Sequence, residues 1–434
     1  FRRGGDLLNR PPHEANVAEQ TEHSINGGGL KFDYFSPNEN HRFNVFASAQ
    51  HINRDSYYGP GDRDPLDAYG NTTDLNWMAG SQYVYSFGKC IFMPSDLTAG
   101  IEFNQDKLED NMWGYNRTVD QKVNIGSAFF QNEWKNEHWG FLIGGRLDKH
   151  NLIDHVIFSP RANLRYNPTE NINLRFSYSS GFRAPQAFDE DLHVENVGGN
   201  VAMVELADNL KEERSQSLSA SADIYHRFGA FQVNFLVEGF YTKLSDVFAL
   251  TDGEIVDGIL TRTRYNAPGA RVMGLTLEGK MAYLTKFQLQ AGITLQQSHY
   301  SEPHVWNKEA PAVKKMMRTP NTYGYFTATY TPIKPLSIAL SGTYTGSMLV
   351  PHEPVPGFLE NPITVNTKDF FDIGLKAAYD FKLYKSMNLQ VNAGVQNIFN
   401  AYQNDFDKGA DRDSGYIYGP SLPRSFFAGV KISY

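Results

Sequence analysis

The stretch Met387-Asn388-Leu389-Gln390-Val391-Asn392-Ala393-Gly394-Val395-Gln396 decides the fold class. Every odd-numbered residue in it is apolar, and every even-numbered residue is polar or glycine. Side chains alternate between the two faces of a β-strand, so this segment presents one apolar face and one hydrated face. The segments Ile172–Ser179 and Leu336–Ser341 repeat the pattern. A one-sided sheet in a soluble protein alternates in the same way, so the length and number of strands must distinguish it from a membrane barrel.

Composition narrows the class of protein. The 434-residue chain has no run of eighteen apolar residues, which excludes a helical membrane span. Aromatic residues make up 14% of the chain. In an outer-membrane barrel apolar residues alternate with polar ones along each strand, so no long apolar run appears in the sequence. The net charge of −8 is spread without a basic patch, so nothing indicates nucleic-acid binding. Cys90 is the single cysteine, which excludes an intrachain disulfide and a multi-cysteine metal site.

Alternation and turn residues predict about seventeen strands, many of them longer than the roughly 5–6 residues usual in soluble sheets. The predicted spans are Glu22–Phe35, His41–Ser56, Thr73–Ser86, Asp96–Glu109, Val119–Lys135, His138–Ile153, Val156–Tyr166, Asn171–Arg183, Glu213–Arg227, Ala230–Leu250, Ala270–Leu284, Phe287–Ser301, Asn321–Thr331, Pro335–Val350, Thr367–Lys382, Ser386–Asn400 and Pro423–Tyr434. The sequence therefore predicts an all-β fold, a transmembrane antiparallel β-barrel.

The connections between these strands alternate in length, apart from a short one near Asp154. Short connections cover residues 36–40, 136–137, 167–170, 285–286 and 332–334, and long ones cover residues 57–72, 184–212, 251–269, 302–320, 351–366 and 401–422. Outer-membrane barrels have short periplasmic turns and long extracellular loops. We therefore expect the long connections to face the outside of the cell.

Strand direction predicts where the barrel is incomplete. The first predicted strand precedes a short turn and the last follows a long loop, so both run towards the periplasm. Single-chain bacterial outer-membrane barrels have an even number of strands, and an odd count therefore predicts missing strands on the N-terminal side and an open-edged barrel. Phe426, Val430 and Tyr434 share one face of the last strand, and this aromatic end resembles the signal read by the barrel-insertion machinery.

Three stretches resemble one family of outer-membrane proteins. They are Gly181-Phe182-Arg183-Ala184-Pro185, Asn209–Ser215, and Asn397-Ile398-Phe399-Asn400 followed by Leu422–Lys431. Together they are similar to the conserved boxes of the TonB-dependent receptors, with Ala207, Asp208 and Glu212 departing from the usual pattern of the second. The family has a barrel of about 22 strands around an N-terminal plug. The resemblance implies that residues 1–434 are the C-terminal part of such a barrel, with the plug and the first strands upstream. Residues 189–193 and 405–420 most resemble receptors from Bacteroidetes.

The resemblance also implies a function. Such a receptor imports a scarce nutrient, such as an iron–siderophore complex, haem or cobalamin, across the bacterial outer membrane. Its partners would be the TonB–ExbB–ExbD complex, the nutrient ligand, and the surrounding lipid and lipopolysaccharide. The alternatives are a glycan-importing receptor with a surface lipoprotein partner and a passive porin. An enzyme is not expected, because the sequence has no local Ser/His/Asp arrangement, no phosphate loop after a strand and no HExxH motif.

Two groups of loop residues are candidate sites. The first is a calcium site formed by carboxylates at alternate or near-alternate positions, because Ca²⁺ prefers several hard oxygen ligands from a flexible loop. Its residues are Asp405, Asp407, Asp411 and Asp413. The alternative is a solvated loop pinned by Lys408 and Arg412, without any metal cofactor.

The second group would contact the imported ligand. Histidine and aromatic side chains in outward loops can bind haem, soft metals or the rings of a chelator. These residues are Tyr57, Tyr58, Trp113, Tyr115, His299, His304, Trp306, His352 and Tyr416. The alternatives are scattered surface residues for the histidines, and residues of the membrane interface or of loop packing for the aromatic ones.

Overall fold

The computed structural model describes residues 1–5, 7–16, 18–59, 64–187, 195–197, 200–251, 253–256, 259–384, 386–409, 412–413 and 415–434. Residues 195–197, 200–202, 254–256 and 259–260 are described by their backbone alone. None of the described helices has the length or the apolar character of a membrane span.

Seventeen long strands form the wall of the molecule, as the alternation predicts. They are β2 (Ala18–Phe35), β3 (His41–Gly59), β4 (Tyr69–Cys90), β5 (Met93–Met112), β6 (Arg117–Lys135), β7 (Trp139–His150), β8 (Ile157–Thr169), β9 (Ile172–Arg183), β12 (Glu213–Phe228), β13 (Phe231–Ser245), β17 (Ala270–Tyr283), β18 (Phe287–His304), β20 (Thr322–Ile333), β21 (Leu336–Thr345), β24 (Phe370–Tyr384), β25 (Met387–Gln396) and β26 (Ser425–Ser433). Each pairs antiparallel with the next along the chain. The all-β, antiparallel prediction is confirmed.

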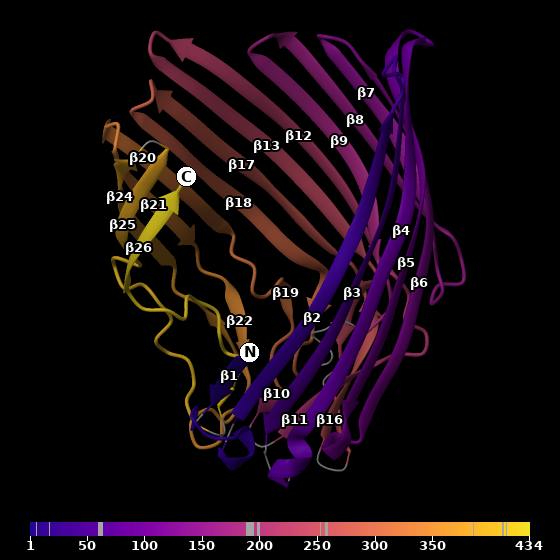
Figure 1. The fold of residues 1–434 in the computed structure, drawn as a ribbon. Helices are drawn as coiled ribbons and strands as arrows, with labels where there is room; N and C mark the ends of the chain where they lie inside the picture. The colour runs from indigo at the N-terminus through magenta and orange to yellow at the C-terminus, as the bar shows by residue number, and fades with distance from the viewer. Residues whose placement is uncertain are drawn as a thin grey trace.

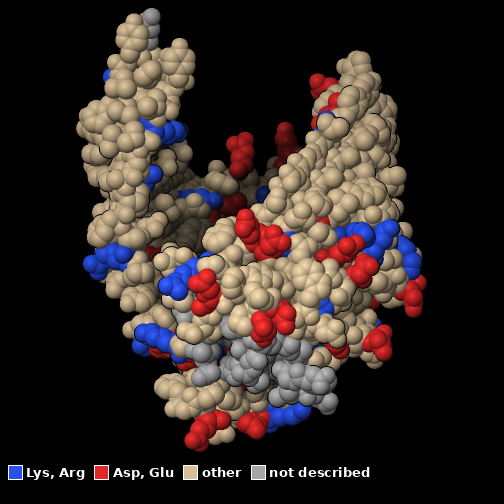
Figure 2. Space-filling view, turned by 60° about the horizontal axis from the view of Figure 1, so that its bottom comes forward, with Lys and Arg blue, Asp and Glu red and all other residues tan. Residues whose placement is uncertain are grey.

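The wall is open along one seam. Among the described residues, β26 pairs with β25 alone, while β2 pairs with β3 and with the short β1 (Arg2–Gly5). Figure 1 shows these two edges apart, with the lumen visible between them. The open-edged barrel expected from the strand directions is therefore present. Figure 2 shows the same opening from the long-loop end as a broad gap between two walls.

The two faces of the wall differ in chemistry. Along β13, the residues Phe231, Val233, Phe235, Val237, Gly239 and Tyr241 occupy one face. Phe235 is 46% exposed and Tyr241 39% exposed, and a row of exposed apolar side chains is the face that meets lipid, so this face is the exterior. The opposite face holds residues such as Glu238, paired with Thr276 of β17. An apolar exterior and a polar lumen are the arrangement of an outer-membrane barrel.

An aromatic row marks the short-turn end of the exterior. Cross-strand pairing joins five aromatic side chains of neighbouring strands, which are Phe228, Phe231, Tyr283, Phe287 and Tyr330. A second cluster near the turn after β6 stacks Trp139 on Tyr166, with ring centroids 4.2 Å apart. Girdles of this kind sit at the membrane–water interfaces of outer-membrane barrels.

The long connections at the other end contain structure that the sequence did not predict. Strands β10 (Glu195–Val197), β11 (Asn200–Leu206), β14 (Val247–Leu250), β15 (Glu254–Val256) and β16 (Ile259–Ala267) form a second sheet, and β22 (Leu349–His352) pairs with β23 (Ile363–Asn366). The short β19 (Val313–Lys315) lies against β18. Three 3-10 helices, η1 (Pro12–Glu14), η2 (Pro65–Ala68) and η3 (Trp113–Tyr115), complete this end.

Two predicted strands are shorter than expected. The span Ala230–Leu250 breaks at Asp246, whose φ of 55° is left-handed and ends β13. The span Pro335–Val350 breaks between β21 and β22. The connection near Asp154 is short as predicted, and the connection between β5 and β6, which contains η3, is shorter still.

Candidate functional site

The C-terminal loop brings His352 and Tyr416 together. Their rings stack with centroids 3.8 Å apart and planes 6° from parallel. The Nε2 atom of His352 lies 2.9 Å from Oδ2 of Asp407. The Tyr416 ring packs with Met348 and Val350 in a small buried cluster, and His352 is buried as well. Because both are almost fully buried, this pair holds two loops together and offers little surface to a ligand.

The carboxylates proposed for calcium have protein partners. Tyr418 donates its hydroxyl hydrogen to Asp405, with oxygens 2.7 and 2.6 Å away. Burial and this hydrogen bond raise the pKa of Tyr418 well above its usual range. Asp413 accepts the amide hydrogens of Glu353 at 2.9 Å and Gly415 at 2.8 Å. The described residues contain no group of three or more metal-binding side chains, and Asp411 lies outside them, so the calcium hypothesis stays a prediction.

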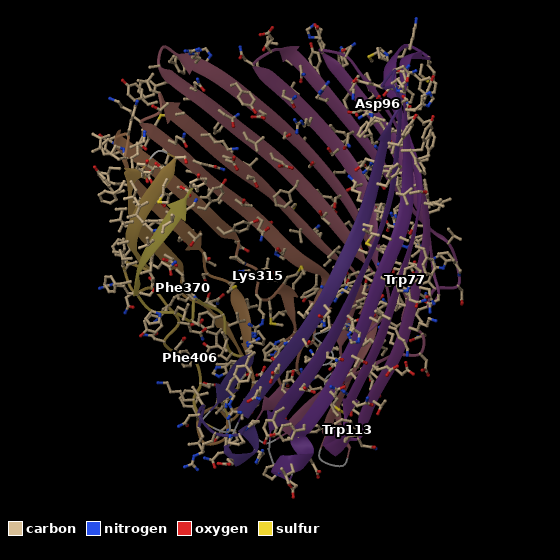
Figure 3. The ribbon with its side chains drawn as sticks, viewed as in Figure 1. Trp77, Asp96, Trp113, Lys315, Phe370 and Phe406 are labelled. Carbon is tan, nitrogen blue, oxygen red and sulfur yellow. The ribbon has the colours of Figure 1, made fainter. Side chains whose placement is uncertain are left out.

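Three of the predicted tyrosines form the core beneath the first loops. Tyr57, Tyr58 and Tyr115 are 1–4% exposed and pack with Met112. The Tyr115 hydroxyl donates to the carbonyl oxygen of Tyr58. The loop-packing alternative therefore describes their position. Trp113 differs, because it is 68% exposed and lies at the tip of the long-loop end (Figure 3).

His299, His304 and Trp306 follow one another near the end of β18. His299 pairs with Arg271 on the exterior face, so it does not line the lumen. His304 lies against Tyr300, with ring centroids 4.9 Å apart. The indole N–H of Trp306 is enclosed and makes no hydrogen bond within the described part of the chain. The Nδ1 atom of His299 is enclosed and without a hydrogen-bond partner among the described residues in the same way.

The sequence did not identify a polar site on the lumen side of β2–β6. A cavity of about 350 Å³ there is lined by His23, Arg54, Thr72, Asp74, Asp106, Gln121 and Gln186, among others. Behind it, Arg54 Nε donates to Thr72 Oγ1 at 3.1 Å, and Thr72 donates to Asp110 at 2.5 Å. Asp110 also accepts from Arg117. This buried network fixes the long-loop ends of four strands and gives the cavity a rigid polar wall.

These residues carry no local sequence motif. Arg54, Thr72 and Asp110 become neighbours through the registers of β3 with β4 and of β4 with β5. The alternation of the sequence places all three residues on the hydrated face, near the ends of long strands. Alternation therefore predicts that they face the lumen, but it does not predict which lumen residues contact one another.

A second lumen feature is a group of arginines on β8 and β9. Arg165 lies directly opposite Arg175 in the register, and Arg161 lies four residues before Arg165 on the same face, towards the long-loop end. Arg161 and Arg175 are exposed to the lumen. None of the three forms an ion pair within the described residues. Like charges directly opposite are unfavourable, so an anion that pairs with these guanidinium groups would remove their repulsion.

The comparisons with known proteins agree with this architecture. Residues 3–398 match the family model of the TonB-dependent receptor-like β-barrel. The chain belongs to the TonB-dependent receptor family. No curated protein matches the chain significantly in sequence.

Solved TonB-dependent receptors have the same fold. The siderophore receptor PirA from Acinetobacter baumannii superimposes with a TM-score of 0.69 at 14% identity, over 96% of this chain and 62% of that one. The ferric-catecholate import receptor Fiu from Escherichia coli K12 gives 0.68 at 13% identity, over 96% and 64%. The iron transporter FrpB from Neisseria meningitidis gives 0.66 at 16% identity, over 95% and 63%. The chain thus spans less than two thirds of these receptors, and such barrels are outer-membrane proteins.

The stretches that resemble the family have structural roles here. Ala184 is buried with Ile153 and Ile157 at the base of the loop after β9, and Arg183 lies over the ring of Phe248, 5.6 Å from its centroid. The acidic run at residues 189–191 lies outside the described residues. In the last stretch, Asn397 Nδ2 donates to the carbonyls of Ala401 and Leu422, each at 3.1 Å. This side chain closes the base of the C-terminal loop.

Proposed function

We propose that this TonB-dependent receptor barrel serves the import of an anionic iron chelate, such as a ferric siderophore. The family match carries the proposal of active import. The printed names of the structural relatives, a siderophore receptor, a ferric-catecholate import receptor and an iron transporter, support iron as the cargo. Haem and cobalamin are the alternative ligands that an import receptor of this kind would carry.

The lumen-facing arginines of β8 and β9 support an anionic cargo. Ferric chelates built from carboxylate or catecholate oxygens carry negative charge. Arg161 and Arg175 lie exposed on the path between the two ends of the lumen and have no carboxylate partner among the described residues. Guanidinium groups bind carboxylates and related oxygen anions in a bidentate way. Cargo would first meet the long-loop end, where Trp113, His304 and Trp306 lie, together with the cavity beside Gln121.

Energy coupling would come from parts that complete the barrel. Among the described residues, the outer edge of β26 and the part of β2 beyond its pairing with β1 leave backbone groups without partners, and such edges are costly in lipid. We propose that further strands close this seam and that a plug domain fills the lumen. The TonB–ExbB–ExbD complex would act on the plug from the periplasm.

The test is binding and uptake by the full-length receptor. Ferric siderophores, haem, cobalamin and oligosaccharides would be titrated against the purified protein, and uptake measured in cells with and without TonB. We expect saturable binding of a ferric chelate and TonB-dependent uptake. Tight binding of an oligosaccharide alone would instead indicate a glycan importer, which would work with a surface lipoprotein. Uptake that persists without TonB and without saturation would indicate a porin.

Charge variants sharpen this test. Removing two lumen charges with Arg161→Gln and Arg175→Gln should slow uptake of the anionic chelate several-fold, because two unpaired cations leave its path. The matched control is Lys280→Gln, whose ammonium is already paired with Glu278 at 2.7 Å on the same lumen face. Equal uptake in both variants would contradict a role for the arginines.

A further inference from the structure

One strand of the wall presents a run of serines to the lumen. Successive lumen-facing positions of β12 carry this residue, and they are Ser215, Ser217, Ser219 and Ser221. The residues between them, such as Leu218 and Ala220, face the exterior. Ser221 lies opposite Glu238, which faces the lumen. Two residues of a strand advance about 6.6 Å, so the run from Ser215 to Ser221 is about 20 Å long.

The two neighbouring strands widen this run into a patch. On β9, Ser179 lies opposite Ser217, and Ser177 lies opposite Ser219. On β13, Thr242 lies opposite Ser217, and their hydroxyl oxygens are 2.9 Å apart. Figure 1 shows the lumen side of β9, β12 and β13 through the open seam. We call these hydroxyl side chains the serine strip, which comprises Ser177, Ser179, Ser215, Ser217, Ser219, Ser221 and Thr242.

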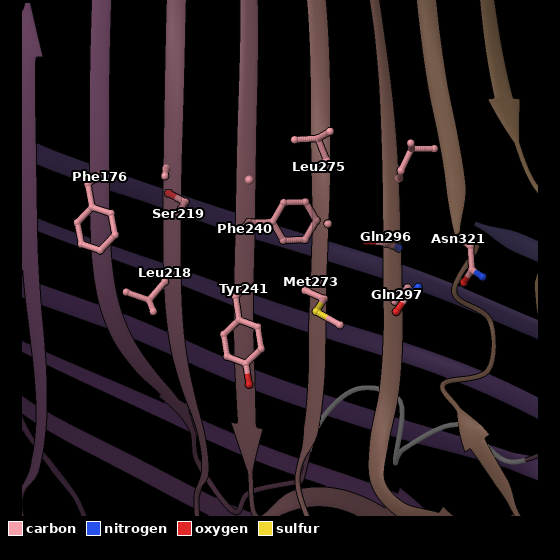
Figure 4. Close-up of a pocket in the computed structure, with 14 residues that line it drawn as sticks. Phe176, Leu218, Ser219, Phe240, Tyr241, Met273, Leu275, Gln296, Gln297 and Asn321 are labelled. Atoms are coloured by element: carbon pink, nitrogen blue, oxygen red, sulfur yellow. The ribbon is translucent and has the colours of Figure 1, made fainter.

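The large side chain of Phe240, next to the serine strip, lies along the wall. Phe240 is opposite Ser219 on one side and Gly274 on the other. Its ring reaches sideways from β13 towards β17 (Figure 4), and a Cβ at Gly274 would lie 2.7 Å from Phe240 Cζ. The glycine therefore lets the ring cover the backbone of β17 instead of standing in the lumen.

The lumen walls on either side of the serine strip carry charged networks instead. On the side of β5 and β7, Arg146 pairs with Glu102 at 3.0 Å and with Asp148 at 2.7 Å. On β17, Lys280 pairs with Glu278 at 2.7 Å. These side chains are long and are fixed by ion pairs, whereas a serine ends one atom beyond its Cβ and its hydroxyl rotates. The serine strip therefore leaves more room beside the wall, and its hydrogen-bonding groups can adapt to what lies against them.

Two arginines border the serine strip. Arg161 lies opposite Ser179, and Arg175 lies opposite Ser221. The Nε atom of Arg175 donates to the side-chain oxygen of Asn173 at 2.7 Å, and neither guanidinium group has a carboxylate partner among the described residues. An anion that moves along the strip would meet a cation at two depths. Between them it would meet neutral hydroxyls, whose hydrogen bonds are weaker than those of a charged group.

We propose that the serine strip is the wall along which the cargo crosses the barrel, in a passage that opens between this wall and the plug. The inference rests on the proposed import of an anionic chelate and adds the route to it. Transit needs contacts that are favourable enough to admit the cargo and weak enough to release it. Hydroxyls bordered by two cations supply such contacts, whereas the groups of the ion-paired walls are already engaged with one another.

The test narrows the passage in the full-length receptor and follows uptake in intact cells. The probes are radiolabelled ferric citrate and a radiolabelled ferric tris-catecholate. Ser217→Trp and Ser219→Trp, made separately, each place an indole in the proposed passage. We expect uptake to fall several-fold in each variant, while binding at the surface of de-energised cells keeps the wild-type affinity, because the long loops are unchanged.

The outcomes distinguish the route from the import function. Wild-type uptake in both tryptophan variants would overturn the route and leave the import function standing. A wild-type receptor that imports neither probe would overturn the import function and the route with it. Loss of surface binding in parallel with uptake would also count against the route, because the defect would then precede transit.

A matched control separates the route from a general loss of lumen space. Ser341→Trp makes the same change on the lumen face of β21, where Ser341 lies opposite Thr327 of β20 and outside the serine strip. Uptake in this variant should stay close to the wild-type rate. An equal loss in Ser341→Trp would contradict the assignment of the passage to β9, β12 and β13.

A conservative variant tests the same wall in a receptor that has already folded. Ser219→Cys nearly keeps the size of the side chain, and Cys90→Ser removes the thiol of the wild-type barrel. A bulky methanethiosulfonate reagent then attaches to Cys at position 219 through a disulfide, which a reductant reverses. We expect uptake to fall on labelling and to recover on reduction, with Ser341→Cys unaffected. Full uptake by receptor whose mass confirms the label would rule out the strip as the route.

Discussion

At the scale of single residues, Glu212 fixes the base of the connection between β9 and β12. It is 5% exposed and lies just before β12. Its carboxylate accepts hydrogen bonds from Arg214 Nε at 2.8 Å and from His155 Nε2 at 3.0 Å. Burial raises the pKa of this carboxyl, but the hydrogen bonds from Arg214, the backbone and His155 outweigh burial and hold it below its ordinary value of 4.5.

This lowered pKa predicts an acid-sensitive loop base. A carboxyl with a depressed pKa in the folded state stabilises the protein above about pH 4.5, and that stability is lost as the pH falls through the folded-state value. Glu212→Gln should remove this pH dependence and cost about 1–3 kcal/mol at neutral pH, since a charged hydrogen bond is lost. Thermal unfolding of the full-length receptor from about pH 7 to 3 measures both effects. Glu170→Gln in an exposed turn is the control, and equal pH slopes in both variants would contradict the prediction.

At the scale of strands, glycines make room for aromatic rings on the neighbouring strand. Gly80 of β4 pairs with Phe46 of β3, and a Cβ at Gly80 would lie 2.6 Å from Phe46 Cζ. Gly342 meets the ring of Phe326 in the same way across β20 and β21. These rings cover backbone that a glycine leaves bare, which helps to fix the register.

Adding a side chain at such a position should destabilise the barrel. Gly80→Val forces the Phe46 ring out of its place, and overpacking of this kind costs about 1–3 kcal/mol. Gly126→Val in β6 is the control, because a Cβ there meets nothing within 4 Å. Unfolding in detergent should show a lower midpoint for Gly80→Val alone. The packing argument fails if both valine variants unfold at the same midpoint.

Alternation and turn residues located all seventeen wall strands, because a strand that crosses a membrane must keep its period along its whole length. It missed the loop strands for a physical reason. β11 pairs parallel with β16, which lies far from it in the sequence. Turn residues indicate hairpins between consecutive strands, so they do not predict this pairing. It also missed the end of β13, where Asp246 adopts a left-handed backbone that its sequence neighbours do not signal.

The candidate site was predictable only in part. The histidines and aromatics of the long loops could be named, and their loops do lie at one end of the barrel. Burial could not be predicted, since Tyr57 and Tyr115 depend on packing between segments far apart in sequence. The network of Arg54, Thr72 and Asp110 depends on strand register, and alternation gives the face of a residue without giving its neighbour.

At the scale of the whole molecule, the difference between the exterior and lumen faces of the wall sets the position of the barrel in the membrane. The aromatic row at one end and the exterior cations Lys243 and Arg271 at the other bracket an apolar exterior, while the lumen face carries charged and polar residues such as Glu238 and Thr276 among its apolar ones. Val237 on β13 lies midway between Phe231 and Lys243 and faces outward. Its neighbour Glu238 faces the lumen, opposite Thr276.

The membrane position predicts opposite outcomes for the same substitution at these two neighbours. Val237→Arg places a charge at the middle of the hydrocarbon and should cost about 2–4 kcal/mol. Glu238→Arg places the same side chain in a hydrated lumen, so its effect should stay within about 0.5 kcal/mol, as for a surface change. Reversible unfolding of the full-length receptor in lipid vesicles measures both. Because the two residues are adjacent on one strand, local strand propensity is the same, and equal losses would mean that the lipid and lumen faces have been assigned wrongly.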